Sequence, residues 1–195
     1  MSKNSLINLL SLALIQGSNA LFPLAVFPYL FSVFDNAEFS KIVISEAIIM
    51  YVLSICLYSF DVSGVKDIAS KQKEQKREKA KEVYWTVLSL RLILFLFIAL
   101  CILISTYIFF NSYFHILLIW LMFPLGMIFQ ANFYYQAMEV NIKLGLIVFI
   151  SRVLACFLTY YLIKDPGSSL LSISIIAGSF LLSGLLSFGY QVYSL

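Results

Sequence analysis

Long apolar runs separated by short polar breaks dominate this sequence. The runs cover about 5–34, 40–62, 84–110, 114–136, 144–163 and 170–193. Each has about the 20 residues that a helix needs to cross a hydrocarbon core, and each is longer than a barrel strand of about 10 residues. The pattern therefore predicts an all-α, polytopic membrane protein with about six transmembrane helices in a single transmembrane domain, 1–195.

The connections between these runs are of two kinds. Short polar stretches lie at 35–36, 111–112, 139–143 and 164–168, whereas the segment 63–83 is long and charged. We expect 63–83 to form a cytoplasmic basic loop. Because six spans nearly exhaust the chain, the sequence leaves no room for an extramembrane domain of any size.

Composition narrows the class of protein further. The chain is 62% hydrophobic and only 12% charged, whereas a soluble domain has roughly 45–50% apolar and about 25% charged residues. This excludes a soluble globular enzyme. It also excludes a disordered chain, which needs low hydrophobicity and many charges.

The basic residues are distributed unevenly between the two sides of the predicted bundle. Lys3, seven residues between Lys66 and Lys81, and Lys143 fall on one side, against Lys41 and Lys164 on the other. Cytoplasmic loops of membrane proteins carry the excess of Lys and Arg. Nine residues against two therefore predict that both termini are cytoplasmic.

The charged segment alternates basic with acidic residues, which is typical of a solvated helix with ion pairs along its face. The interleaved acids, and the absence of aromatic residues among the lysines, argue against nucleic-acid binding. We expect the segment to contact anionic lipid headgroups and to fix the topology. Its basic residues are Lys66, Lys71, Lys73, Lys76, Arg77, Lys79 and Lys81.

The first span carries polar and helix-breaking residues in its middle. Pro23 and Pro28 each remove a backbone donor, and Gln16 and Asn19 precede them. Freed carbonyl groups at this depth are tolerated against protein or a wet cavity, and not against lipid. The four residues predict a helix that lines a cavity, with a simple packing kink as the alternative.

Four ionisable residues lie inside predicted spans: Lys41, Glu46, Arg91 and Arg152. Such residues cost about 2.5–3.5 kcal/mol each on insertion scales, so they indicate function by default. We predict that Arg91 and Arg152 face a shared cavity and bind an anionic substrate, since arginine suits phosphate and carboxylate groups. The alternative is that both snorkel to headgroups. Lys41 and Glu46 also rank as cavity-lining residues, although they can instead pair with one another.

Two further patterns favour packing roles. Ser179, Ser183 and Ser187 recur every four residues beside Gly184, which predicts close approach of another helix and no chemistry. The aromatic cluster 133–135 is typical of an interfacial belt.

Catalytic constellations are missing from the sequence. The single histidine, His115, has no acid, serine or metal-binding partner at a suitable spacing, and no Walker, GxGxxG or HExxH motif occurs. We therefore predict no catalytic residue, no metal site and no cofactor. A passive or ion-coupled transporter fits best, with an intramembrane transferase left open.

Three segments resemble one family, the O-antigen-type polysaccharide flippases of the multidrug/oligosaccharidyl-lipid/polysaccharide exporter superfamily. QGSNALFPL at 16–24, followed by FPYL at 27–30, resembles the family's first helix. YSFDVSGVKDIA at 58–69 resembles its exit from helix two, and FYYQAME at 133–139 its end of helix four. Departures from the family pattern are Ser59 and Ala137 for glycine, Lys66 for arginine and Phe133 for tryptophan.

The resemblance implies a bacterial inner-membrane protein that exports an undecaprenyl-diphosphate-linked oligosaccharide repeat unit to the outer leaflet. It also implies work alongside the polysaccharide polymerase machinery. It further implies that two six-helix lobes enclose a cavity and rock about it. This chain corresponds to the N-terminal lobe. We expect a truncated lobe, with a half-transporter that pairs with itself as the alternative.

Two other functions stay open. A sister branch of the superfamily exports cationic drugs with ion gradients, for which Glu46 is the deep acidic candidate. A truncated, non-transporting membrane subunit is the third possibility.

Overall fold

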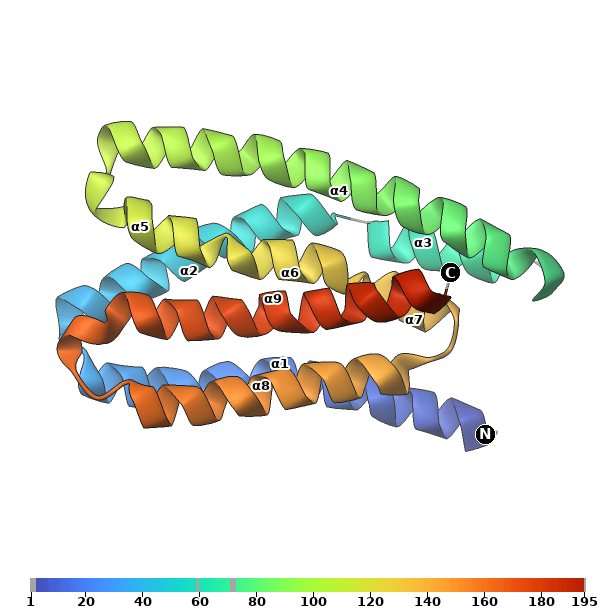
Figure 1. Ribbon diagram of the computed structural model, residues 1–195, viewed down its shortest axis with the longest axis horizontal. Helices are drawn as coiled ribbons and strands as arrows, with labels where there is room; N and C mark the ends of the chain where they lie inside the picture. Colours follow the sequence, from blue (N-terminus) through green and yellow to red (C-terminus); the bar gives the residue numbers. More distant parts are fainter. Residues whose placement is uncertain (1–2, 59, 71–72, 195) are drawn as a thin grey trace.

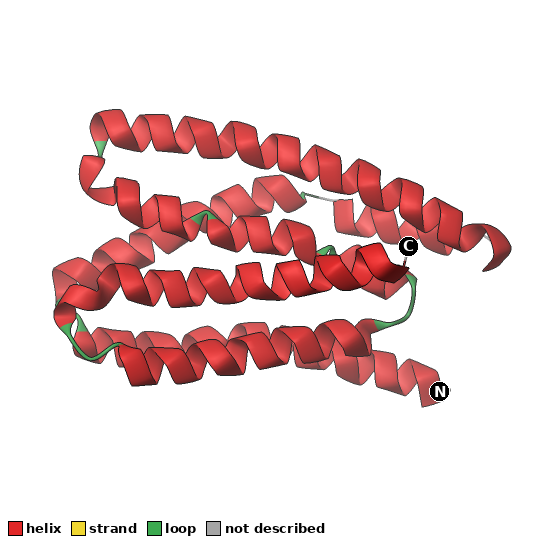
Figure 2. Ribbon diagram, viewed as in Figure 1, coloured by secondary structure: helices red, strands yellow, loops and turns green. Residues whose placement is uncertain are grey.

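The apolar segments form helices that run back and forth along the long dimension of the molecule (Figure 1). The computed structural model describes residues 3–58, 60–70 and 73–194. No strand occurs in this described part of the chain (Figure 2). The helices are α1 Lys3–Val33, α2 Asn36–Leu57, α3 Phe60–Ala69, α4 Lys73–Phe109, α5 Asn111–Trp120, α6 Met122–Gln130, α7 Asn132–Ala137, α8 Asn141–Leu162 and α9 Ser169–Ser194, with a 3-10 turn at Pro166–Ser168.

Six helical stretches are long and apolar enough to cross a membrane. Four of them lie in the single helices α1, α4, α8 and α9, the last together with the preceding 3-10 turn, while α2 with α3 and α5 with α6 and α7 form the other two. The prediction of an all-α, multi-pass membrane protein with six spanning helices is confirmed.

The charged segment 63–83, whose alternating charges are typical of a solvated helix, is mostly helical in its described residues. Helix α3 continues to Ala69 and α4 begins at Lys73; Lys71 lies outside the described residues. The alternating charges support a helix, and Lys79 and Glu82 form an ion pair of 2.9 Å. With 37 residues, α4 is about 55 Å long, so its charged end extends beyond a hydrocarbon core of about 30 Å.

Both chain termini lie at one end of the bundle, which we call the terminal end (Figure 1). The α3–α4 and α7–α8 connections lie at the same end. The connections from α1 to α2, from α4 to α5 and from α8 to α9 lie at the opposite end. This arrangement places Lys143, at the start of α8, on the same side as the charged end of α4.

Two spans are broken by residues in the left-handed region of backbone space. Tyr58, with φ 34°, ends α2, and Ala131, with φ 42° and ψ 61°, separates α6 from α7. Such conformations cost a non-glycine residue on the order of 1–3 kcal/mol. The predicted single helix 114–136 is therefore three consecutive helices, which the hydropathy pattern cannot reveal.

Helices α6 and α9 approach each other so closely that only glycine fits at the crossing. A Cβ atom added to Gly126 would overlap the backbone of Phe180 and Leu181, and one added to Gly184 would overlap the backbone of Gly126. The close approach that the small residues of the last span predict is thus confirmed, with Gly126 as its counterpart on the other helix.

The aromatic cluster 133–135 is not an interfacial belt. Phe133, Tyr134 and Tyr135 are at most 2% exposed. The Phe133 ring lies against Gly64, where an added Cβ would come within 2.8 Å of it. The break at Ala131 turns this cluster into the core between α3 and α9, and such a turn has no hydrophobic signature.

The glycine crossing gives a test of the packing. Replacing Gly184 by alanine should destabilise the protein by about 1–3 kcal/mol, because the added methyl group meets backbone that cannot rotate away. The measurement is thermal unfolding of the purified protein in detergent. Gly178→Ala, on the same helix with nothing within 4 Å of its added Cβ, is the matched control. Equal melting temperatures for the two variants would contradict this packing.

Candidate functional site

Arg152 lies in the middle of α8 and is only 3% exposed. Its Nε donates a hydrogen bond of 3.2 Å to the Asn19 side-chain oxygen on α1, and its Nη1 donates one of 3.0 Å to the Ser179 hydroxyl on α9. Three helices therefore meet at this guanidinium group. The prediction that Ser179 serves packing alone is wrong, because its hydroxyl holds the arginine.

The charge of Arg152 is not neutralised by the protein around it. Its guanidinium lies over the Phe180 ring, 3.5 Å from the centroid, and 5.8 Å from that of Phe22. No carboxylate pairs with it among the described residues, and its buried Nη2 has no hydrogen-bond partner there. A buried charge without a partner is strongly destabilising. The fold therefore leaves the charge of Arg152 without a counter-ion among the described residues.

A groove of about 420 Å³ opens between α1 and α8 beside Arg152. Small residues of α1, among them Gly17 and Ser18, form its floor. The described residues that line the groove are uncharged except for Arg152. The lining is Ala13, Leu14, Gly17, Ser18, Leu21, Phe22, Ala25, Phe149, Arg152, Val153 and Cys156.

A second, smaller cavity of about 130 Å³ is lined in part by Asn19. Glu46 of α2 is its acidic lining residue, and this side chain makes no hydrogen bond or ion pair with any described residue. The cavity is bounded by four helices, α1, α2, α6 and α9. Its lining is Asn19, Phe22, Pro23, Phe27, Glu46, Met50, Phe123, Met127, Ile176 and Phe180.

The other residues predicted to line a cavity behave differently from one another. Pro23 and Pro28 border a third depression shared with Glu46, yet α1 remains helical through both prolines. Gln16 lies exposed on α1 and borders none of these three cavities. Lys41 pairs with Glu38 at 2.8 Å, so the alternative pairing of Lys41 with Glu46 is wrong; three residues along a helix is a better spacing for contact than five.

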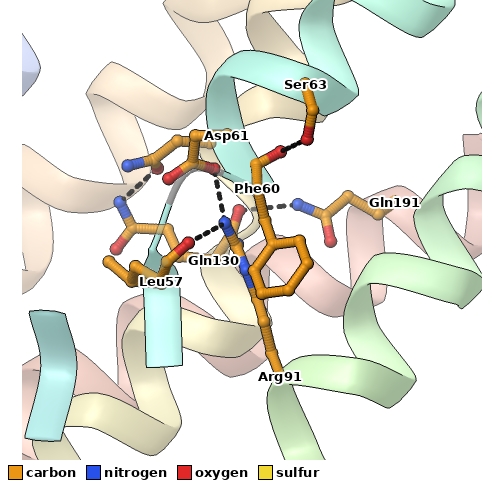
Figure 3. A network of polar contacts seen from close by, with 8 residues as sticks. Leu57, Phe60, Asp61, Ser63, Arg91, Gln130 and Gln191 are labelled. Carbon is orange, nitrogen blue, oxygen red and sulfur yellow. Dashed lines mark hydrogen bonds and ion pairs between the residues drawn. The ribbon is translucent and has the colours of Figure 1, made fainter. Parts of the chain in front are cut away.

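Arg91 occupies a different place in the bundle. It is 1% exposed and forms an ion pair of 3.0 Å with Asp61 at the start of α3. Its Nη2 also donates to the Leu57 carbonyl at 3.5 Å. As Figure 3 shows, the guanidinium thus joins the last turn of α2 to the first turn of α3. Arg91 bridges the break at Tyr58, where α2 leaves backbone groups unsatisfied.

The two arginines do not share a site. Arg91 contacts α2, α3 and Phe133, whereas Arg152 contacts α1 and α9. Among the described residues their polar and ring contacts have no residue in common. The expectation of one cavity flanked by both arginines is therefore not met, because Arg91 already has its counter-charge in Asp61.

A buried polar network escaped the sequence analysis. Gln130, at the end of α6, donates a hydrogen bond of 2.9 Å to Asn132, across the break at Ala131. Gln191 of α9 donates to the Gln130 carbonyl at 2.8 Å and accepts from the Tyr84 hydroxyl at 2.8 Å. Figure 3 shows this network beside Arg91. The signal in the sequence was the presence of two glutamines inside apolar spans. These glutamines form hydrogen bonds at the break in the helix, as a membrane interior requires.

Metal chemistry finds no support in the described part of the chain, where no group of three or more His, Cys, Asp or Glu side chains is placed to hold an ion.

Comparison with known proteins gives a distant relative. The chain is 25% identical over 189 residues to a protein named "Putative O-antigen transporter" from Escherichia coli strain K12. The match covers 95% of this chain and 45% of that protein, so the chain spans less than half the length of the relative. No protein-family profile matches the chain, and no solved structure matches it significantly.

Replacing Asp61 by asparagine tests the role of Arg91. The change leaves a guanidinium that is 1% exposed without its counter-charge. Breaking a buried pair costs about 3–5 kcal/mol, and Asp61 is 31% exposed, so we expect a loss of about 1–3 kcal/mol in unfolding free energy. Thermal unfolding in detergent measures it. Asp67→Asn, an exposed position on the same helix, is the control, and an equal effect of both changes would contradict the structural role.

Proposed function

We propose that this chain is a flippase that moves undecaprenyl-diphosphate-linked oligosaccharide repeat units from the cytoplasmic to the outer leaflet of a bacterial inner membrane. The observation that carries the proposal is Arg152, a buried cation in the middle of a spanning helix. Its Nη2 is unpartnered, and no carboxylate pairs with it among the described residues. The distant similarity to a protein named as an O-antigen transporter supports the same class of substrate.

The chemistry of the site suits this substrate. A diphosphate offers several charged oxygens, and arginine binds phosphate through paired N–H donors. Asn19 and Ser179 already hold Nε and Nη1, which orients the free Nη2. The apolar groove between α1 and α8 lies beside the same guanidinium, so an isoprenoid chain and a diphosphate would find suitable surfaces next to each other.

Transport requires a second half that closes the pathway. Gln16 is exposed in the middle of a spanning helix, and Glu46 is only partly covered. Polar groups at this depth are expected to face protein or water rather than lipid. We propose that a second six-helix lobe, or a second copy of this chain, covers them and that the two halves rock to give alternating access. The exported units would then pass to the polysaccharide polymerase machinery.

A cation-coupled exporter of drugs is the second candidate, favoured by Glu46, whose carboxylate has no polar partner in the described residues. Deletion of the gene distinguishes the candidates. Loss of surface polysaccharide with accumulation of lipid-linked repeat units identifies a flippase, and increased drug sensitivity with a normal surface identifies the alternative. If neither changes, the result favours a non-transporting subunit.

The Arg152 site is tested in the deletion strain by complementation. Arg152→Ala should abolish surface polysaccharide while the protein still accumulates in the membrane, because the diphosphate loses its counter-charge. Arg152→Lys keeps the charge without the planar fork, so we expect partial restoration at best. The readouts are surface polysaccharide and internal lipid-linked repeat units. Arg77→Ala, at an exposed position of α4, is the matched control, and full export by Arg152→Ala would contradict the assignment.

We further propose that the terminal end faces the cytoplasm, because most basic residues lie there. A membrane-impermeant thiol reagent added to intact cells should label Ser168→Cys, near the opposite end, and leave Ser70→Cys unlabelled until the cells are opened. Ser70 follows the last residue of α3, and Ser168 lies in the 3-10 turn between α8 and α9. The reverse labelling pattern would overturn the orientation.

A further inference from the structure

Asn19 links two opposite charges that have no counter-ion among the described residues. It accepts a hydrogen bond from the buried Arg152, whose Nη2 is unpartnered. It also lines the cavity of about 130 Å³ together with Glu46, which is half-buried and has no polar contact among the described residues. A buried charge such as Arg152 is costly alone, and Glu46 is the acidic residue that shares this cavity lining.

Three residues connect the two groups. Asn19 accepts the hydrogen bond from Arg152 and also lines the cavity that Glu46 lines. Phe22 and Phe180, whose rings contact the guanidinium, line that cavity as well. A cavity of this volume exceeds the space that one water molecule needs. Glu46 therefore borders an unfilled volume whose lining includes three residues that contact Arg152.

We propose that Glu46 is the exchangeable counter-charge of Arg152: the two side chains pair across the Asn19 cavity when no substrate is bound, and an anionic substrate displaces Glu46. Glu46 is thus a positioning residue that acts through Arg152. The proposal rests on the proposed function for its substrate, a diphosphate lipid, whereas the pairing itself rests only on the geometry.

The packing of the helices allows the two residues to approach. Helix α1 packs mainly on α8, the helix that carries Arg152 and that packs in turn on α9, whereas α2, which carries Glu46, packs on α4, α5 and α6. Figure 1 shows α1 and α8 together at one side of the bundle. Since α1 and α2 have few contacts with each other, a small shift of the α1–α8 pair toward α2 would close the cavity. Pro23, one turn after Asn19, lines the cavity and weakens α1 at that place.

Such an exchange would help a transporter to release its substrate. A lone arginine would hold a diphosphate tightly and release it slowly. A carboxylate that competes for the same guanidinium lowers the apparent affinity, because only the unpaired fraction of the protein binds substrate. Glu46 would therefore promote release in the outer leaflet and neutralise Arg152 during the return of the empty transporter.

The pairing is tested first without substrate, by exchanging the charges in the purified full chain. Arg152→Glu places two carboxylates at the cavity and should lower the melting temperature. Adding Glu46→Arg to it should restore most of that loss, because the pair is re-formed in reverse. Adding Glu38→Gln instead, a change of acid on the same helix, should restore none. Failure of Glu46→Arg to restore the melting temperature would overturn the pairing.

If the charge-reversed protein does not accumulate, neutral variants keep the test decisive. Arg152→Gln leaves Glu46 without a counter-charge, so Glu46→Gln should cost much less stability in that background than in the unsubstituted chain. Equal costs in both backgrounds would show that the two residues are independent, and the proposal would fail.

The competition is tested with undecaprenyl diphosphate as the probe. Glu46→Gln should bind it about 5- to 150-fold more tightly, the usual range of coupling between two sites, and should export repeat units more slowly. Glu38→Gln should bind like the unsubstituted chain. Unchanged affinity in Glu46→Gln overturns the competition. If the unsubstituted chain does not bind the probe while charge exchange still restores stability, the proposed function fails and the pairing stands.

Discussion

The membrane interior offers no water to a polar group, so each buried donor, acceptor or charge in this chain must find its partner inside the protein. That constraint explains the breaks in the helices. The break at Ala131 is satisfied by Gln130, Asn132 and Gln191. The break at Tyr58 is bridged by Arg91, which joins the Leu57 carbonyl to Asp61. Arg91 belongs to α4 and Gln191 to α9, so these two helices supply side chains that reach the breaks.

The two buried arginines differ in whether the fold supplies a counter-charge. Arg91 and Arg152 are both nearly inaccessible to solvent, and both contact two aromatic rings. Arg91 has a carboxylate at 3.0 Å, whereas Arg152 has two neutral oxygens and a free Nη2. A charge that its own fold neutralises contributes to the fold. Arg152 instead lies beside the groove between α1 and α8 without a counter-ion among the described residues.

Hydropathy predicted the class of fold and the six spans, because the length of an apolar run is set directly by the thickness of the bilayer. The same reasoning found Asn19 and Arg152, since polar groups in a membrane carry a cost that the sequence displays. It could not separate Arg91 from Arg152, because Asp61 lies 30 positions from its partner and only the break at Tyr58 brings them together. Spacing along the chain also suggested the wrong partner for Lys41. Hydropathy did not show that 111–137 forms three helices.

The distribution of tight packing completes the picture. Helices α6 and α9 are locked at Gly126 and Gly184, where no additional atom fits, and the network of Gln130 and Gln191 fastens α4 to them. The cavity at Asn19 lies at the edge of this rigid unit, where α1 meets α2 with few contacts. The small-residue groove and the proline after Asn19 belong to the α1–α8 pair, whereas Glu46 lies on α2 and Arg152 is bonded to Ser179 of α9. The cavity therefore lies where α1, which has few contacts with α2, meets the tightly packed helices, and a group bound there would contact both.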